Sequence, residues 1–398
     1  MGSYVPRRAE KLLKDYLELT PILALVGARQ VGKTTMTKHT LEGEGNVPYV
    51  TFDDPSVLML FNESIHEFHR DLIEGHELVV MDEVQYGTDV GRKLKFLCDV
   101  KDARMVITSS SETLLRRDVL SHLVGRLTLL KLHPFSTREY LTARGIKTES
   151  WKYVTGHIRE HISYGGYPRV VLENGIEKKQ KLLTDIISLT VIRDVVHSFG
   201  LSDELKAFKL MRMLAEQTGN ILEIASISRD SGIPYAKVSA FINAFEMSGI
   251  LTLLRPFFKN RRTEVVKAPK VYFQDCGIRN SIRGSFDVDG PGFEGHILAE
   301  LTKHDFPVRY WRTMSKAEVD FVVEVGPHLI AVEAKMGDPK PSRSLRSFMN
   351  KYAPNRAYVV TMRAHEPRSD RGVIQVNPLD LIEQLDELKR SSGAAKPS

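Results

Sequence analysis

Short apolar runs alternate with helical patterns along the first third of the chain. The runs at 22–26, 77–85 and 104–111 are nearly continuous, and a fourth, RLTLLKL, covers 126–132. Apolar runs separated by helical segments are typical of strands that are buried on both faces of a parallel sheet. We therefore predict an α/β fold, with a parallel sheet in the N-terminal domain.

The pattern changes after about residue 200. A helical segment ends at Gly219, a short helix follows over EIASISRDSG, and a third helix starts at Pro234. Two strand-like pieces, LTLLRPFF and KVYFQD, come next. Helix, short helix, turn, helix and hairpin is the order of a winged helix-turn-helix, which we predict for residues 201–285.

A hairpin is predicted over 319–335, where two β-branched runs flank Gly326-Pro327. With a two-residue loop, Asp320 lies directly opposite Glu333, on the same face as Lys335. Like charges that face each other across a strand pair destabilise it by up to roughly 1 kcal/mol. Either Lys335 neutralises the two carboxylates, or a cation belongs between them.

Composition narrows the class of protein. The chain has 398 residues, too many for one core, and its 42% hydrophobic and 27% charged residues are ordinary for a globular protein. No apolar run approaches the roughly 20 residues that cross a bilayer, and the charged N-terminus has no signal core. Cys98 and Cys276 are far apart and form no CxxC, which argues against a disulfide scaffold or a zinc site. We expect a cytoplasmic protein with no membrane partner.

The charge distribution is compatible with a nucleic-acid partner. The formal net charge is +6, and residues 255–270 hold six basic side chains and one acid, Glu264. The predicted DNA contacts are Lys237 on the third helix and Lys259, Arg261, Arg262 and Lys267 on the wing. Such side chains contact phosphates, with weak sequence preference and steep salt dependence. The alternative is a winged fold that serves as a packing or protein-contact module.

The strongest motif is GARQVGKTT, which follows the strand at 22–26 and opens a helical segment. This is the P-loop spacing in its required strand–loop–helix context. Backbone N–H groups of such a loop converge on phosphates, Lys33 reaches the β and γ phosphates, and the Thr34 hydroxyl binds Mg²⁺. The predicted ATP contacts are Gly27, Ala28, Arg29, Gln30, Val31, Gly32, Lys33, Thr34 and Thr35.

Two acids end the strand at 77–85, about 50 residues after the P-loop. In a P-loop ATPase the first, Asp82, binds Mg²⁺ through water, and the second, Glu83, orients the attacking water. The next strand ends in hydroxyls, and Ser110 is the predicted γ-phosphate sensor. The sequence therefore predicts Mg²⁺-dependent ATP hydrolysis.

These motifs, together with FDDP, LVGR and HPFSTREYL, resemble a bacterial and archaeal family of AAA+-type ATPases in which an uncharacterised region follows the ATPase. The resemblance covers nearly the whole chain and implies a helical lid after the core sheet. One departure is Ser109, which stands where the family usually has Gly. Arg126 matches the family's Gly-Arg pair, which implies an arginine finger that acts on a neighbour in a homo-oligomer. The alternative is an Arg that braces a turn.

The C-terminal segment resembles the PD-(D/E)XK nuclease core, with an acid on the helix at 293–304, an acid opening the second strand and ExK in the third. A helical SRSLRSFMNKYAP and a strand-like RAYVVTM follow, as that fold requires. The resemblance implies that Asp320 and Glu333 hold Mg²⁺ with Glu300 assisting, and that Lys335 orients water. The alternative is an ion-pair ladder, since Lys335 lies opposite Glu318 in the same register.

Three parts are predicted in all. They are an AAA+ core at about 1–132 with a helical lid at about 133–200, a winged helix-turn-helix at 201–285, and a nuclease-like α/β domain at 286–388, before a disordered tail at 389–398. The predicted function is Mg²⁺-dependent ATP hydrolysis that repositions the C-terminal modules on DNA, with nuclease activity left open. The alternatives are a non-cutting, ATP-gated DNA-binding switch and a regulator that contacts a protein.

Overall fold

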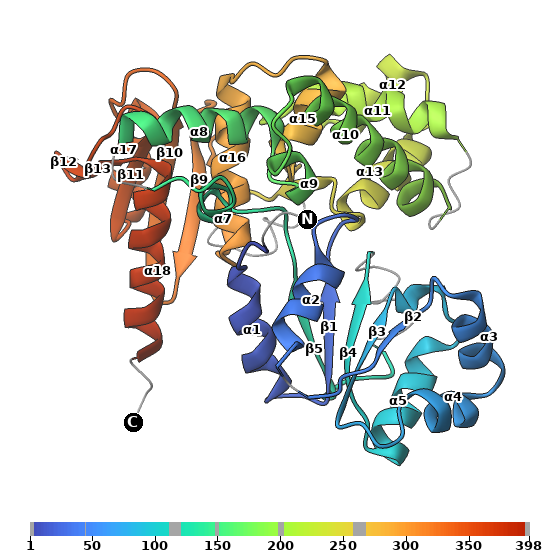
Figure 1. Cartoon of the computed structure of the whole chain (residues 1–398). Coiled ribbons are helices and arrows are strands. Elements are labelled where there is room, and N and C mark those ends of the chain that lie inside the picture. Colours follow the sequence, from blue (N-terminus) through green and yellow to red (C-terminus); the bar gives the residue numbers. More distant parts are fainter. Residues whose placement is uncertain are drawn as a thin grey trace. The chain divides into compact units, whose positions relative to one another are not determined.

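The computed structural model describes residues 4–43, 45–110, 121–147, 151–197, 203–257 and 268–394. The chain forms two compact units (Figure 1). The N-terminal unit comprises Met1–Pro134, Ile186–Glu204 and Asn243–Gly249, and the C-terminal unit comprises Phe135–Asp185, Leu205–Ile242 and Ile250–Ser398.

The N-terminal unit is built on a five-stranded sheet in the order β2-β3-β4-β1-β5. Its strands are β1 (Ile22–Val26), β2 (Tyr49–Thr51), β3 (Leu78–Asp82), β4 (Arg104–Ser109) and β5 (Leu127–Lys131). All neighbouring strands pair in parallel, and β1 lies between β4 and β5 with every residue buried. The predicted parallel sheet is therefore confirmed.

Helices cover both faces of this sheet. They are α1 (Arg8–Leu17), α2 (Lys33–Leu41), α3 (Pro55–Glu63), α4 (Ile65–Leu72) and α5 (Val90–Lys101), with a short η1 (Val84–Tyr86) after β3. Alternate residues of β1, such as Ala24, share a core with Phe61 of α3, Phe68 of α4 and Leu94 of α5. Because α1 packs on β1, β5 and α2 and contributes nothing to that core, it covers the other face.

The segment after β5 is helical, as predicted for a lid. Its elements are α7 (Thr137–Ala143), α8 (Trp151–Tyr164), α9 (Pro168–Val171), α10 (Ile176–Leu189) and η3 (Thr190–His197). Residues 135–185, however, belong to the C-terminal unit rather than to the sheet that carries the P-loop. The reason is a set of buried side-chain to main-chain bonds. Asn280 donates to the carbonyls of Ile162 and Ser163 at 3.0 Å each, and Asp275 accepts the N–H of Gly166 at 2.7 Å.

Three helices and a strand pair follow in the order expected for residues 201–285. They are α11 (Glu204–Glu216), α12 (Ile224–Ser231), α13 (Tyr235–Met247), β6 (Leu251–Leu254) and β7 (Lys270–Phe273), with β6 antiparallel to β7. Two more helices, α15 (Cys276–Arg283) and α16 (Gly290–Lys303), lead to the second sheet.

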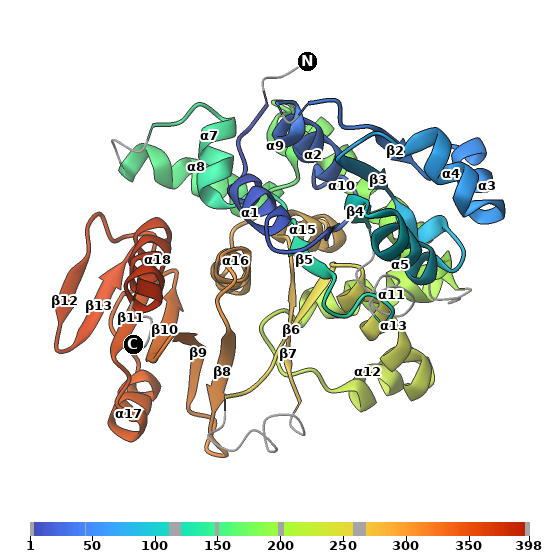
Figure 2. The same ribbon diagram turned by 90° about the horizontal axis from the view of Figure 1, so that it is seen from below.

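The second sheet has six strands in the order β12-β13-β11-β10-β9-β8 (Figure 2). Its elements are β8 (Val308–Arg312), β9 (Glu318–Val325), β10 (His328–Lys335), α17 (Arg343–Tyr352), β11 (Arg356–Thr361), β12 (Arg368–Asp370), β13 (Val373–Val376) and α18 (Pro378–Ala394). Strands β8, β9 and β10 are antiparallel, whereas β11 is parallel to β10 and to β13. The sheet is therefore mixed.

The predicted hairpin is confirmed. Val325 of β9 pairs with His328 of β10, so Gly326-Pro327 is a two-residue loop, and Gly326 has φ 57°. At the other end of the chain, α18 runs to Ala394, so residues 389–394, which we predicted to be disordered, are helical. The Lys389 ammonium donates to the carbonyl of His304 at 3.2 Å, which anchors this last part of α18.

Candidate nucleotide-binding site

The P-loop joins the carboxyl end of β1 to the first turn of α2. A Cβ on Gly27 would lie 2.3 Å from the carbonyl oxygen of Leu132, so this position accepts only glycine without a shift of the backbone. Gly32 precedes the helix with φ 97°, a left-handed conformation that glycine adopts at little cost. The two motif glycines therefore allow the loop to turn tightly between strand and helix.

Lys33 is buried at the base of this loop. Its ammonium donates to the carbonyl oxygens of Gly27 at 2.9 Å and Ala28 at 3.4 Å, and it lies 3.8 Å from the Glu83 carboxylate. An ammonium that is held by loop carbonyls can exchange them for phosphate oxygens, which are stronger, charged acceptors. Lys33 is thus placed where a bound triphosphate would need a cation.

Asp82, at the end of β3, is held by two hydroxyls. Thr34 donates to one carboxylate oxygen at 3.1 Å, Thr108 of β4 donates to the other, and the N–H of Glu83 donates to the Thr108 hydroxyl at 3.1 Å. Burial, and then the neighbouring Asp82 carboxylate, raise the pKa of Tyr49 on β2 above its usual value, so this phenol stays protonated. Asp82 is therefore surrounded by hydroxyl groups from three elements, α2, β4 and β2.

Glu83 has a left-handed backbone, with φ 57°, at the start of η1. Its carboxylate accepts a hydrogen bond from Gln85, and the same amide donates to the hydroxyl of Ser110 at 3.1 Å. Ser110 is buried at the end of β4. Glu83 and Ser110 are thereby linked through Gln85, a residue that the sequence motif did not single out.

The other predicted loop contacts have distinct surroundings. Arg29 donates to the Tyr86 hydroxyl at 2.7 Å, Gln30 has φ 63°, and Thr35 is exposed on α2. The carbonyl of Val31 accepts a hydrogen bond from the buried Arg7 at 3.0 Å, and Arg7 also donates to the carbonyl of His133 at 2.6 Å. This anchor of the loop was missed, because an Arg before the first helix carries no motif.

The residues around Asp82 suit a nucleotide with Mg²⁺. Thr34 and Asp82 offer hard oxygen ligands, which Mg²⁺ prefers, and Mg²⁺ usually completes its shell with water and phosphate oxygens. Over the described residues, no three His, Cys, Asp or Glu side chains gather as a protein-only metal site. A Mg²⁺ ion shared with phosphates needs no such cluster.

Arg126 lies at the opposite edge of the same sheet. Its carbonyl accepts the N–H of Ile22, at the amino end of β1, and its guanidinium pairs with Asp99 of α5. Arg126 therefore cannot reach the P-loop at the carboxyl end of β1 within its own subunit. Action on a neighbouring subunit and bracing through Asp99 both remain compatible with this position.

In the C-terminal unit, the hairpin brings its acids together as the register predicts. Asp320 accepts the N–H of Ala334 at 2.9 Å, Glu333 accepts the N–H of Ser342 at 3.0 Å, and Lys335 pairs with Glu333 at 3.1 Å. The predicted alternative, in which Lys335 pairs with Glu318, is wrong. Glu318 pairs instead with Arg312, its partner residue on the neighbouring strand β8, and with the buried Lys270 of β7.

Glu300 is not brought to these acids. It accepts the N–H of Thr137 at 2.9 Å and pairs with Lys303 at 3.1 Å. Burial alone would raise the pKa of Glu300, but Lys303 lowers it below its usual value. The acid of α16 whose charge reaches Asp320 is Glu294, six residues earlier.

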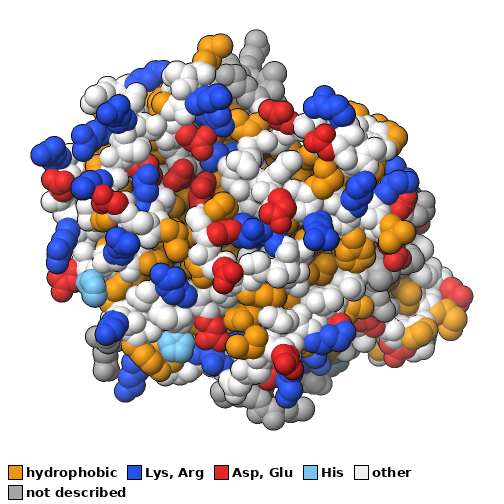
Figure 3. Space-filling model, turned by 90° about the horizontal axis from the view of Figure 1, so that it is seen from above, with side chains coloured by type: hydrophobic (Ala, Val, Ile, Leu, Met, Phe, Trp, Pro, Cys, Tyr) orange, Lys and Arg blue, Asp and Glu red, His pale blue; other side chains and the backbone are white. Residues whose placement is uncertain are grey.

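The predicted DNA contacts are only partly visible. Lys237 is half-buried on α13, while Lys259, Arg261, Arg262 and Lys267 lie outside the described residues. On the face drawn in Figure 3, Lys and Arg side chains are interspersed with Asp and Glu, and no continuous basic patch is visible there among the described side chains.

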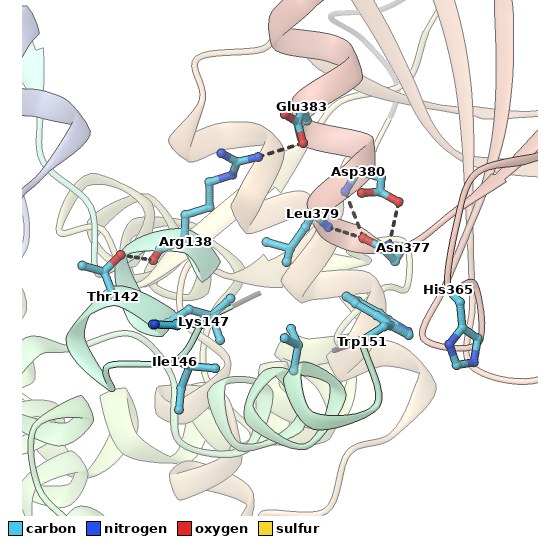
Figure 4. Close-up of a pocket in the computed structure, with 12 residues that line it drawn as sticks. Arg138, Thr142, Ile146, Lys147, Trp151, His365, Asn377, Leu379, Asp380 and Glu383 are labelled. Carbon is cyan, nitrogen blue, oxygen red and sulfur yellow. Dashed lines mark hydrogen bonds and ion pairs between the residues drawn. The ribbon is translucent and has the colours of Figure 1, made fainter. Parts of the chain in front are cut away.

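A pocket of about 750 Å³ opens elsewhere in the C-terminal unit, between α7, α8 and α18 (Figure 4). Arg138 pairs with Glu383 at 3.0 Å across it, and the Asn377 amide donates to Asp380 at 2.7 Å. Since these polar groups pair with one another, we assign the pocket no ligand.

Comparison with known families supports part of this picture. A family model for an AAA domain matches residues 19–141, and two models for domains of unknown function, DUF8612 and DUF4143, match residues 155–289 and 289–382. The first match includes the P-loop, Asp82 and Glu83. This match supports the AAA-type P-loop ATPase predicted for this part of the chain.

Relatives of the whole chain are uncharacterized. A protein of Mycobacterium tuberculosis is 26% identical over 357 residues, covering 86% of this chain and 76% of that protein. One from Haemophilus influenzae is 21% identical over 311 residues, covering 77% of each chain. Among solved structures, a Walker-type ATPase of Pyrococcus abyssi has a TM-score of 0.46 at 15% identity, covering 70% of this chain and 96% of that one.

In the described part of the chain, no helix combines the length and the hydropathy that a bilayer crossing requires.

Proposed function

We propose that this protein binds ATP with Mg²⁺ at the P-loop and hydrolyses it. The proposal rests on four side chains that lie together where β1 and β3 end. The Lys33 ammonium lies 3.8 Å from the Glu83 carboxylate, and the Thr34 hydroxyl lies 3.1 Å from the Asp82 carboxylate. A cation, a hydroxyl and two carboxylates are the groups that phosphoryl transfer to water needs.

Each of these residues has a separate role in ATP binding or hydrolysis. Backbone N–H groups of the loop and of the α2 N-terminus bind phosphate oxygens, and the Lys33 ammonium leaves the carbonyls of Gly27 and Ala28 to join them. Thr34 and Asp82 would hold Mg²⁺, which neutralises charge on the phosphates when bound. The Glu83 carboxylate accepts a proton of the attacking water and aims it, with Gln85 fixing the carboxylate and linking it to Ser110.

Replacement of Lys33 by Ala tests nucleotide binding. A hydrogen bond to a charged group contributes roughly 1.5–3 kcal/mol, so we expect the Kd for ATP to rise about 10- to 100-fold. A fluorescent ATP analogue titrated into each purified protein measures this. Lys11→Ala, which removes an exposed lysine from α1, is the control and should bind as wild type does. Equal affinity in Lys33→Ala and Lys11→Ala would contradict a P-loop site.

We further propose that residues 201–285 contact DNA phosphates, and that ATP turnover repositions this contact. The support is the order α11, α12, α13, β6, β7 together with five basic side chains in residues 255–267; the sixth of this stretch, Lys270, is buried and paired with acids. A partner protein in place of DNA is the alternative.

Salt dependence tests the DNA contact. Removal of two phosphate contacts in Arg261→Ala/Arg262→Ala should reduce the slope of log affinity against log salt by roughly 2 for random duplex DNA. Fluorescence anisotropy between 50 and 200 mM salt, about the range over which such binding weakens strongly, measures it. Lys178→Ala/Lys181→Ala removes two cations from α10 as a matched control. Equal slopes in both double variants would reject the wing as the contact.

The nuclease-like assignment of residues 286–388 is supported by the order α16, β8, β9, β10, α17, β11 and by Asp320, Glu333 and Lys335 on one hairpin. The predicted set of three metal-binding carboxylates, Asp320, Glu333 and Glu300, fits the structure less well than this order of elements does. Glu300 is bound elsewhere, and the described residues contain no group of three ligands. We therefore derive no cleavage step through a metal ion in this unit.

A further inference from the structure

An acidic cluster surrounds a single buried lysine at the junction of β7, α16 and β9. Lys270, the first residue of β7, is 2% exposed. Its ammonium lies 3.2 Å from the Glu294 carboxylate of α16 and forms an ion pair with Glu318 of β9. The Tyr272 hydroxyl, 3.4 Å from the same ammonium, donates to Glu294. One cation thus joins acids from two elements.

Asp320 belongs to the same electrostatic cluster. Asp320 follows Glu318 by two residues on β9, and alternate residues of a strand share a face, so Asp320 lies on the same face as the Glu318 carboxylate that pairs with Lys270. Burial alone would lower the pKa of Lys270, but Glu294 and Glu318 raise it above its usual value, so the ammonium is charged. A buried ammonium is costly unless it is paired. The carboxylates around it provide that pairing.

The remaining acids of the hairpin region are also compensated within the chain. Arg312 lies 3.3 Å from Glu318, and Lys335 lies 3.1 Å from Glu333. A divalent ion placed at Asp320 would meet these cations as well as the carboxylates. Repulsion between the ion and Lys270 opposes binding, since like charges in a buried region interact strongly.

We propose that the Lys270 ammonium is the resident cation of this acidic cluster, in the place of the divalent ion that a nuclease of this fold holds. The C-terminal unit is then a self-neutralised, non-cutting module. This inference does not rest on ATP hydrolysis by the N-terminal unit. The facing carboxylates of the hairpin call for a cation near Asp320, and in this proposal that cation is the Lys270 ammonium.

Lys270 also links two segments of the chain that are matched by different domain models. It lies in the segment 155–289 that one domain model matches, whereas Glu318 and Asp320 lie in the segment 289–382 that another matches. The same junction carries main-chain bonds. The N–H of Phe257 donates to the carbonyl of Tyr310 at 2.6 Å, and the Tyr310 hydroxyl donates to the carbonyl of Ala268 at 2.7 Å. Both described ends of the basic segment are therefore fastened to β8, and Lys270 clamps β7 to the same sheet.

Mn²⁺ binding to the full-length protein tests the proposal. Free Mn²⁺ is measured by electron paramagnetic resonance without nucleotide, and an Asp82→Asn background removes any contribution from the P-loop. We expect no Mn²⁺ binding in that background. With Lys270→Met added, which keeps the length of the side chain without its charge, we expect a new Mn²⁺ site, with an affinity at least tenfold above the detection limit that applies to the background protein. That site should be lost when Asp320→Asn is also present.

Three further readings complete the test. Both tryptophans, Trp151 and Trp311, lie in the C-terminal unit, so their fluorescence reports whether this unit stays folded. Lys270→Arg, which keeps the positive charge, should fold and bind no Mn²⁺. A folded Lys270→Met protein without a new site overturns the proposal. Mn²⁺ binding to the Asp82→Asn protein that disappears when Asp320→Asn is added also overturns the proposal. This measurement does not depend on whether the Lys270→Met protein folds.

Discussion

We expect replacement of Glu83 by Gln to lower the rate of ATP hydrolysis by about 10²- to 10⁴-fold, the usual contribution of a positioned general base, while ATP binding is retained. Glutamine keeps the size of the side chain and its contact with Gln85 but cannot accept a proton from water. The Lys33 and Thr34 side chains are untouched, so the phosphate and Mg²⁺ contacts remain. Phosphate release at saturating ATP measures the rate, and analogue binding measures the affinity.

The control for this change is Glu77→Gln, which removes an exposed carboxylate just before the same strand. We expect wild-type rates for it. If Glu83→Gln hydrolyses ATP as fast as Glu77→Gln, another group activates the water. Ser110, linked to Glu83 through Gln85, would then be the next residue to replace.

Arg126→Ala carries the second large expected effect. If Arg126 reaches the active site of a neighbour, its loss lowers hydrolysis by about 10³- to 10⁵-fold with ATP affinity unchanged. Asp99→Asn is the matched control, since it removes the same ion pair and leaves Arg126 in place. A trans finger predicts that only Arg126→Ala is inactive. A brace predicts that both variants keep their activity and lose a similar, small amount of stability, as exposed ion pairs do.

Mixing experiments sharpen this prediction. A Lys33→Ala subunit lacks a working P-loop but retains Arg126, whereas an Arg126→Ala subunit has the reverse defect. Mixed oligomers should regain hydrolysis if the arginine acts between subunits. Two inactive proteins that stay inactive when mixed, although they assemble, would exclude the finger.

The local parts of the structure were readable from the amino-acid order. A P-loop is a run of nine residues, and its glycines, lysine and hydroxyls act through backbone geometry that depends on near neighbours in the chain. The 319–335 hairpin follows from the two-residue period and one Gly-Pro turn. Asp82 and Glu83 were identified because an acidic pair follows an apolar strand about 50 residues after the P-loop.

Other contacts in the structure could not be predicted from local sequence patterns. Glu294 and Glu300 both lie on α16, but six residues make about 1.7 turns of a helix, so the two side chains are about 120° apart and point to different neighbours. Hydrophobic periodicity did not reveal which of these acids faces Asp320. Likewise, Arg7 carries no motif, and its role emerges only where its guanidinium meets the carbonyls of Val31 and His133.

The amino-acid order therefore sufficed for the kind of elements, the phosphate-binding loop and the acids beside it, because those depend on short-range geometry and on a repeating pattern. Three-dimensional packing was needed to assign residues 135–185 to the C-terminal unit and to place Lys270 among the acids. Such contacts join residues about 25 to 160 positions apart. Their energies come from burial and charge pairing at a junction, and neither quantity exists until the chain has folded.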